Sequence, residues 1–281
     1  MHKPQRQPAH AEGPKDGPMR IAKALARAGL CSRREAERWI GEGRVKVNGE
    51  VLTSPARDIG PSDKVLVDGN PLPLAEPPRL WRYHKPRGLV TSHADPRGRP
   101  TVFAALPDHL PRVISVGRLD FNSEGLLLLT NDGALARHLE LPATGWMRRY
   151  RVRAHGTVAQ DALDKLKDGL EIEGVRYGPI EAALDKAQGS NVWITIGLRE
   201  GKNREVRKIL DTLGLKVNRL IRVSFGPFQL LELKAGEVEP VRRRVMIDQL
   251  GARIAMSLGI VDVEETPQAK RKRQRAREHA P

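Results

Sequence analysis

The sequence contains one cysteine, Cys31, among 281 residues. A single thiol excludes intramolecular disulfides and clustered thiolate metal sites, and it fits a reducing compartment such as the cytoplasm. Long apolar runs are missing too: none approaches the roughly 20 residues that a membrane-spanning helix needs, and no apolar segment follows the first basic residues. We therefore expect a cytoplasmic protein that is neither exported nor embedded in a membrane.

Signatures of common cofactor sites are also missing. No G-x-G-x-x-G follows a predicted strand, so a dinucleotide site or a Rossmann-type methyl-donor site has no support. The segment GLREGK is one residue short of phosphate-loop spacing, and Asn203 stands where Ser or Thr would bind magnesium. The eight histidines are scattered, with no pair at metal-ligand spacing. We expect neither cofactor nor metal.

Charge is what the sequence has in excess. There are 49 Lys and Arg against 34 Asp and Glu, a formal net charge of +15. Such an excess predicts a polyanionic partner held through phosphate contacts and counterion release, and nucleic acid is the first candidate. A generically basic surface is the alternative, but the clustering of the positive residues favours nucleic acid.

Composition divides the chain into four parts. Residues 1–18 are proline-rich without apolar periodicity and predict a disordered leader. Residues 19–79 predict a small domain with a proline-containing linker, and residues 80–262 a larger domain. Residues 263–281 predict a basic disordered tail, which either lies along RNA phosphates or is a solvated end without function.

The small domain is predicted to begin with two basic helices. In the first, Ile21, Leu25 and Ala28 share an apolar face, and the second begins with a capping box formed by Ser32 and Glu35. The opposite faces carry candidate RNA-binding residues: Arg20, Lys23, Arg27, Arg34 and Arg38.

Short hairpins follow, the first with Asn48-Gly49 at its turn. This order of elements and the run ALARAGLCSRREAERWIGEGRVKVNG resemble the S4 RNA-binding domain. The alternative is a satellite domain whose arginines only add solubility.

The larger domain has more predicted strands than helices, in irregular alternation. The strands are residues 112–117, 126–130, 149–156, 191–198 and 216–225, and the helices are residues 133–141, 158–169 and 203–214. This pattern favours an α+β fold with a mixed, mainly antiparallel sheet and a central cleft over a doubly wound sheet.

The segment VGRLDFNSEGLLLLTNDG places Asp120 in a polar corner just before four leucines. A polar loop between two strands would hold this acid rigidly at the rim of a cleft. The alternative is a turn aspartate that caps local amides. Glu124 suggests the paired carboxylates of a glycoside hydrolase, but two acids in one short loop do not establish a flanking pair.

A second segment, EGKNREVRKILDTLG, predicts an amphipathic helix that ends at Gly214. Its core face is formed by Val206, Ile209, Leu210 and Leu213, and its basic face by Arg204, Arg207 and Lys208. Arg204 is a further candidate for RNA binding. Spacing alone is equally compatible with a solvated charged face.

The Asp120 segment closely resembles the signature loop of the RsuA-type pseudouridine synthases. The segments YHKPRGLVTS, RRYRVR, EGKNREVRKIL and GLKVNRLIRVSFGP resemble the other family segments in order. With the S4-like part, the resemblance covers about residues 19–245. DPRGRPTVFAALP and the basic C-terminal extension are most similar to members that act on the large ribosomal subunit.

The resemblance implies an isomerase that converts a specific uridine of large-subunit ribosomal RNA to pseudouridine. It implies that Asp120 is the catalytic aspartate, that Tyr150 lines the uracil pocket, and that Arg207 pairs with Asp120. Leu220 would pack beneath the site, and Arg118 would help to hold the extruded nucleotide. We expect the chain to act as a monomer.

The reaction gives a reason for an acid beside leucines. The bond between N1 of uracil and the ribose breaks and the base rejoins through C5, so one ionised carboxylate suffices, as nucleophile or as base at the sugar. Burial beside the leucines favours the neutral acid, which Arg207 would oppose, and an apolar floor would exclude water. The target base must be flipped out and stacked on Tyr150. A noncatalytic RNA-binding or ribosome-assembly factor is the alternative.

Overall fold

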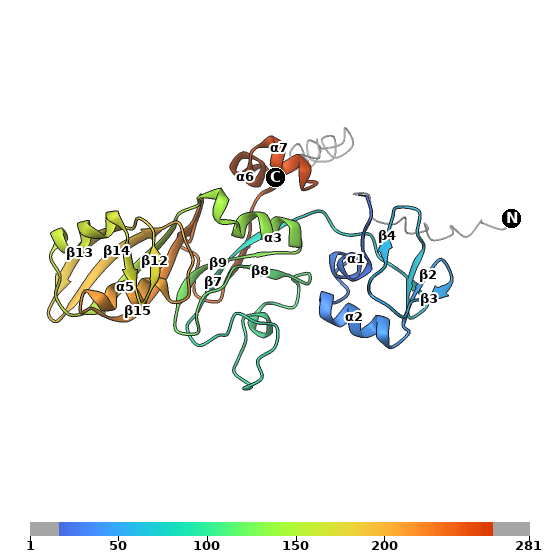
Figure 1. Cartoon of the computed structure of the whole chain (residues 1–281), viewed down its shortest axis with the longest axis horizontal. Coiled ribbons are helices and arrows are strands. Elements are labelled where there is room, and N and C mark those ends of the chain that lie inside the picture. Colours follow the sequence, from blue (N-terminus) through green and yellow to red (C-terminus); the bar gives the residue numbers. More distant parts are fainter. Residues whose placement is uncertain (1–16, 261–281) are drawn as a thin grey trace, which may run out of the picture. The chain divides into compact units, whose positions relative to one another are not determined.

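The computed structural model describes residues 17–260, and the chain divides into two compact units (Figure 1). The first unit consists mainly of the residues up to Pro77, and the second begins at Pro78. The predicted tail and all but two residues of the predicted leader lie outside the described residues. In the described range, no helix is long and apolar enough to cross a membrane.

The first unit packs two helices against short strands. Its elements are β1 Met19–Arg20, α1 Ile21–Arg27, α2 Arg33–Gly41, β2 Val45–Val47, β3 Glu50–Val51, β4 Asp58–Ile59, β5 Val65–Val67 and β6 Asn70–Pro71. A four-stranded sheet has the order β3-β2-β5-β6, and β1 pairs with β4. Asn48 and Gly49 form the turn between β2 and β3 with φ values of 53° and 92°, which confirms the predicted hairpin.

This unit has a hydrophobic core of its own, in which Ile21, Leu25 and Ile40 are fully buried. The predicted capping box is present at the start of α2. The Ser32 hydroxyl accepts a bond of 3.1 Å from the amide of Glu35, and the Glu35 carboxylate accepts one of 3.5 Å in return. The two helices are therefore fixed by local capping and by a continuous apolar face.

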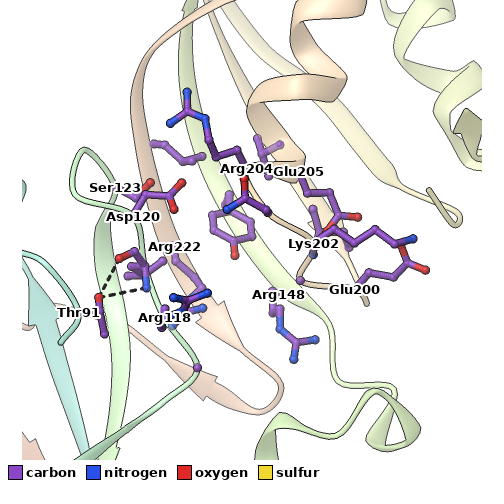
Figure 2. A pocket seen from close by; sticks show the side chains of 18 of the residues that line it. Thr91, Arg118, Asp120, Ser123, Arg148, Glu200, Lys202, Arg204, Glu205 and Arg222 are labelled. Atoms are coloured by element: carbon purple, nitrogen blue, oxygen red, sulfur yellow. Dashed lines mark hydrogen bonds and ion pairs between the residues drawn. The ribbon is translucent and has the colours of Figure 1, made fainter. Parts of the chain in front are cut away.

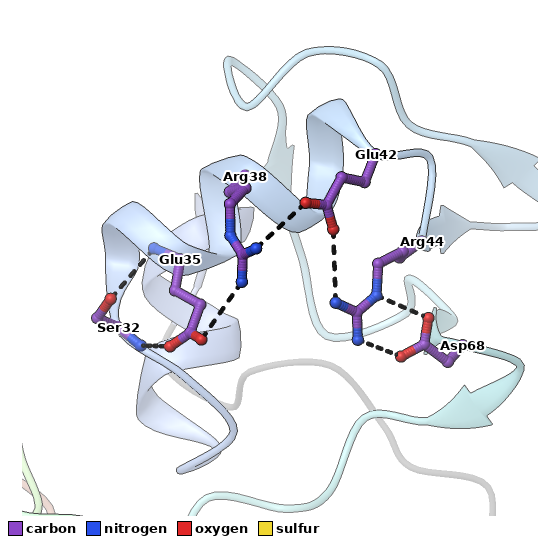
Figure 3. Close-up of polar contacts among 6 residues, drawn as sticks. All are labelled: Ser32, Glu35, Arg38, Glu42, Arg44 and Asp68. Atoms are coloured by element: carbon purple, nitrogen blue, oxygen red, sulfur yellow. Dashed lines mark hydrogen bonds and ion pairs between the residues drawn. The ribbon is translucent and has the colours of Figure 1, made fainter.

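Ion pairs follow the outer side of α2 (Figure 3). Arg38 lies 3.7 Å from Glu35 and 3.4 Å from Glu42, so its charge is partly compensated. Of the other candidate RNA-binding residues here, Lys23 and Arg34 are exposed. Arg20 pairs with Asp58 at 3.4 Å, and the Arg27 side chain is only 26% exposed. The positive charge on this surface is thus less uniform than the helical spacing indicates.

The second unit is built on one large sheet. Its strands are β7 Leu80–Lys85, β8 Ile114–Val116, β9 Glu124–Thr130, β10 Arg148–His155, β13 Glu181–Gln188, β14 Asn191–Leu198, β15 Lys216–Phe225, β16 Phe228–Gln229 and β17 Val238–Pro240. The main order is β13-β14-β10-β15-β9-β7-β17; β16 pairs with β15, and β8 pairs with β9. Only the β15–β9 pairing of the described strands is parallel along this path, so the predicted mixed, mainly antiparallel sheet is confirmed.

Helices and a small hairpin accompany this sheet. They are α3 Gly133–Glu140, α4 Gln160–Asp164, α5 Glu205–Thr212, α6 Arg243–Leu250 and α7 Ala252–Ser257, the single 3₁₀ turns η1 Phe103–Ala105, η2 Pro142–Thr144 and η3 Lys165–Asp168, and the hairpin of β11 Leu170–Ile172 and β12 Val175–Tyr177. The helix predicted over residues 158–169 is thus α4 followed directly by a 3₁₀ turn.

A glycine is required where β9 meets β15. Gly125 has φ +103°, and a Cβ at this position would lie 2.3 Å from the carbonyl oxygen of Arg222. Because glycine has no Cβ, β9 can lie parallel to β15 with Gly125 opposite Arg222. The loop that carries Asp120 is thereby held beside β15.

Candidate active site

A pocket of ≈ 540 Å³ lies in the second unit (Figure 2). It is lined by the loop between β8 and β9, by β10, by β15 and by the segment that leads into α5. Five of the predicted site residues line it: Arg118, Asp120, Tyr150, Arg204 and Leu220. The fold therefore brings together residues that are up to about a hundred positions apart in the sequence.

Asp120 is half-buried in the β8–β9 loop. Its backbone carbonyl accepts bonds from the Ser123 amide at 3.0 Å and from the Lys85 ammonium group at 3.1 Å. Its carboxylate has no hydrogen bond or ion pair in the part of the chain that the structure describes. The loop is thus closed by backbone groups, and the side chain does not cap the turn.

Asp95 shows what a turn-capping aspartate looks like in this protein. Its carboxylate accepts the amides of Arg97 and Arg99 at 3.2 and 3.0 Å, and the Arg99 guanidinium at 2.7 Å. These bonds, above all those from Arg99, hold the pKa of Asp95 far below its usual range. Asp120 has none of these contacts, so its carboxylate is available to a bound molecule.

The apolar surface of the pocket comes from residues other than the four leucines. Leu126 to Leu129 are fully buried in β9, which pairs with β7, and none of them lines the pocket. The apolar floor that the sequence predicts beside Asp120 is therefore not made by these leucines, because β9 lies within the sheet and is buried at every position. The pocket is instead lined by Leu119, Tyr150, Leu198, Val206, Leu220 and Phe225. Tyr150 and Leu220 lie on the adjacent strands β10 and β15.

Arg207 connects α5 to the loop of Asp120. It donates to the carbonyl of Asn122 at 3.3 Å and to that of Val217 at 3.1 Å. Burial lowers the pKa of Arg207, and the negative charge of Asp120 acts against this shift. No ion pair joins the two side chains among the described residues, so Arg207 holds the loop through its backbone and acts on Asp120 through space.

Helix α5 is shorter than predicted. It begins at Glu205, and Arg204 precedes it in a left-handed conformation with φ 51°. The core residues Val206, Ile209 and Leu210 are buried as predicted. Because Arg204 lies outside the helix, it is not part of the solvated helix face that the spacing predicts. It lines the pocket.

Comparison with known proteins agrees with this geometry. A family model of the S4 domain matches residues 19–71, and a model of RNA pseudouridylate synthases matches residues 79–212. An uncharacterized RNA pseudouridine synthase of Rickettsia felis is 49% identical over 228 residues, which are 81% of this chain and 98% of that protein. The chain belongs to the RNA pseudouridine synthases.

Other relatives extend the comparison. The synthase is 38% identical over 269 residues to ribosomal large subunit pseudouridine synthase B of Pseudomonas aeruginosa, covering 92% of this chain and 69% of that protein. A crystal structure of a pseudouridylate synthase, 28% identical, has a TM-score of 0.58 and covers 83% of this chain and 99% of that chain. The S4 domain and the synthase domain are thus both recognised, in the order that the sequence predicts.

Lys85 is a residue of the synthase's site that the sequence did not reveal. It is fully buried, and its ammonium group donates to the carbonyls of Pro86, Asp120 and Ser123 at 3.0, 3.1 and 2.9 Å. Burial lowers its pKa to about 8, against the charges of Asp120 and Glu124. Lys85 therefore positions the Asp120 loop from below. Two signals could have found it: its place in the segment YHKPRGLVTS, and a lysine at an inward position of an alternating strand.

We expect Lys85→Met to remove a pH-dependent part of the synthase's stability. The pKa of Lys85 is about 8 in the fold and 10.5 in an ordinary lysine, so between these pH values the unfolded chain binds more protons. This contribution to the free energy of unfolding rises with pH by at most about 1.4 kcal/mol per pH unit. Below pH 8 Lys85 is protonated in both states, so the folded state carries the full cost of the buried charge. Urea denaturation of both proteins from pH 8 to 10.5 measures it, and equal slopes would contradict the assignment.

Glu124 is not a second catalytic carboxylate. It is 8% exposed and accepts a two-pronged pair from Arg219, with distances of 2.6 and 3.2 Å. Both carboxylate oxygens are thereby occupied, so the glycoside hydrolase alternative has no pair of free acids. In the described range, no cluster of three His, Cys, Asp or Glu residues could hold a metal ion.

Proposed function

We propose that this synthase isomerises a specific uridine of large-subunit ribosomal RNA, in the cytoplasm and as a monomer, with Asp120 as its catalytic group and without a cofactor. The observation that carries the proposal is the uncapped Asp120 carboxylate in a pocket shared with Tyr150 and Leu220. The ribosomal substrate is supported by relatives named ribosomal large subunit pseudouridine synthase B in Pseudomonas aeruginosa and Pasteurella multocida.

Asp120 acts at the sugar of the flipped nucleotide, either as nucleophile at C1′ or as base at C2′. The C1′–N1 bond breaks, the base turns and the C1′–C5 bond forms, which displaces the carboxylate in the nucleophilic route or is accompanied by return of the C2′ proton in the other. The proton then leaves C5 while N1 gains one, so the composition is unchanged. Either role uses the carboxylate of Asp120, whose charge interacts through space with Lys85 and Arg207. The apolar lining limits the water that would hydrolyse an activated sugar.

The flipped base is held on the β10–β15 side of the pocket. Tyr150 supplies a ring on which uracil stacks, and Leu220 packs against it. Arg118 and Arg204 are exposed and line the pocket, where they reach phosphates of the RNA strand.

The test is conversion of unmodified ribosomal RNA by the purified protein, followed by mapping of pseudouridines in cells with and without the gene. We expect one uridine of the large subunit to be modified only when the protein is present. Binding of this RNA without any conversion would favour the noncatalytic alternative.

We also expect that deletion of residues 1–74 weakens RNA binding and flattens its dependence on salt, while the second unit stays folded. The first unit has its own core, so its removal leaves the large sheet complete. Each lost phosphate contact lowers the slope of log K against log salt by about 0.7 to 0.9. Filter binding between 50 and 200 mM salt measures the slope, and a slope equal to that of the full chain would contradict this role.

A further inference from the structure

Two buried arginines lie at one end of the pocket. Arg222 is 3% exposed and Arg148 is 8% exposed, and both line the pocket. Their guanidinium carbons lie 5.2 and 4.6 Å from the ring centre of Phe225. Figure 2 shows them, with the exposed Arg118, at the end opposite to Arg204. Both guanidinium groups are thus within cation–π distance of the same ring.

Neither of these arginines has an acidic partner within the described residues. Arg222 donates from Nε to the carbonyl of Leu126 at 2.7 Å, but its Nη2 is buried without a hydrogen bond. Arg148 donates only to the carbonyls of Trp146 and Arg199. Across the described chain, neither arginine forms an ion pair. Uncompensated buried charge is costly, and two such cations repel each other.

The neighbouring acid acts on Arg148 through space but forms no ion pair with either arginine in the described range. Glu205 is buried and lines the same pocket, but its carboxylate accepts the amide of Lys202 at 2.9 Å. Burial is the main cause that lowers the pKa of Arg148; the charge of Arg222 acts in the same direction, and Tyr150, Glu205 and Glu140 act against it. By contrast, Arg219 on the same strand as Arg222 has a complete pair with Glu124. Arg148 and Arg222 are thus buried at the pocket without an ion pair in the described chain, whereas Arg219 on β15 has one.

We propose that Arg148 and Arg222 form an anion subsite that binds one phosphodiester of the RNA beside the flipped nucleotide. This rests on the proposed function, since it takes the RNA strand as the source of the phosphate. Arg222 is directly opposite Tyr150 on the neighbouring strand, so the bound phosphate lies next to the stacked base. Planar guanidinium groups match the non-bridging phosphate oxygens, and both arginines line the pocket.

The subsite links binding to flipping. In the free protein the two cations repel each other, and a phosphate relieves this repulsion only when the strand enters the pocket. An RNA held elsewhere on the basic surface does not reach these residues. The arginines therefore favour the flipped arrangement over general RNA binding.

The first experiment uses inorganic phosphate and thermal melting and needs no turnover. We expect about 10 mM phosphate, compared with chloride at equal ionic strength, to raise the Tm of the wild type by about 3 °C. Arg222→Met and Arg148→Met should lose at least half of this rise. Arg153→Met, an exposed arginine on the other face of β10, removes the same charge and should keep all of it.

The second experiment tests the RNA itself. Methylphosphonate replaces, one at a time, the phosphates around the uridine identified by mapping. We expect one position at which the neutral linkage lowers kcat/KM of the wild type about tenfold, mainly through KM, because a charge-assisted contact is lost. In Arg222→Met the same linkage should have almost no further effect, and Arg222→Lys should recover part of the sensitivity.

The outcomes separate this proposal from the proposed function. Equal phosphate-induced Tm rises in all variants would overturn the subsite, whether or not the protein modifies RNA. If Arg222→Met does not fold, Arg148→Met and Arg222→Lys answer the same question. If the phosphate-induced Tm rise depends on both arginines but the protein converts no uridine, the subsite is supported and the proposed isomerase activity is refuted.

Discussion

Asp120→Asn is expected to abolish conversion of uridine while folding and RNA affinity persist. An amide is a poor nucleophile and a poor base, so the rate should fall by at least about 1,000-fold. The substitution is nearly isosteric, and the loop is closed by the backbone bonds of Asp120 to Ser123 and Lys85, which asparagine retains. RNA binding should stay equal or become slightly tighter, because one negative charge near the phosphates is removed.

Stability distinguishes the catalytic role from a structural one. The Asp120 carboxylate makes no hydrogen bond in the described chain, so we expect the free energy of unfolding to change by no more than about 0.5 kcal/mol. A turn cap would instead cost about 0.5 to 2 kcal/mol and leave the folded fraction active. Asp211→Asn, an exposed acid on α5, is the matched control. Thermal melting, filter binding and pseudouridine mapping on one preparation decide the matter, and a folded Asp120→Asn protein that still converts uridine would exclude Asp120 as catalyst.

Arg207→Leu is expected to lower the conversion rate about 100-fold, the effect of removing one positioned cationic donor at a reacting centre. Two results of the change act together. The carbonyl of Asn122, two residues after Asp120, loses its donor, and the carboxylate loses a nearby positive charge. Single-turnover conversion with saturating enzyme measures the loss without a contribution from RNA affinity.

Two variants test this explanation for Arg207. Arg207→Lys keeps the charge but loses the planar group that reaches both Asn122 and Val217, so it should recover only part of the rate. Lys208→Leu removes a neighbouring charge whose partner, Glu173, is 79% exposed, and it should convert normally. A near-normal rate of Arg207→Leu would show that Arg207 is not needed at the site, and Lys85, which also interacts with the charge of Asp120, would be the next residue to test.

Sequence reasoning found the elements whose local pattern agrees with their final environment. The capping box of α2, the Asn48-Gly49 turn and the strands β10, β14 and β15 are of this kind. It missed β13, whose segment EAALDKAQ consists largely of good helix formers. Hydrogen bonding along β14 over most of the length of β13 overrides that preference, because strand propensity depends on the neighbouring strand.

The sequence alone determined the family, the order of the two domains and the mixed sheet, because these depend on local patterns and on motifs that occur in order along the chain. That Asp120 is the catalytic acid stays a prediction. The tertiary structure decided what surrounds Asp120. The four leucines are buried in β9 and do not line the pocket, and Lys85 donates to the backbone of the Asp120 loop. Arg207 donates to backbone carbonyls. Arg148 and Arg222 lie beside Phe225 without an ion pair in the described chain. These contacts join segments far apart in the chain, and burial and charge at each of them depend on the packed sheet, which no local spacing records.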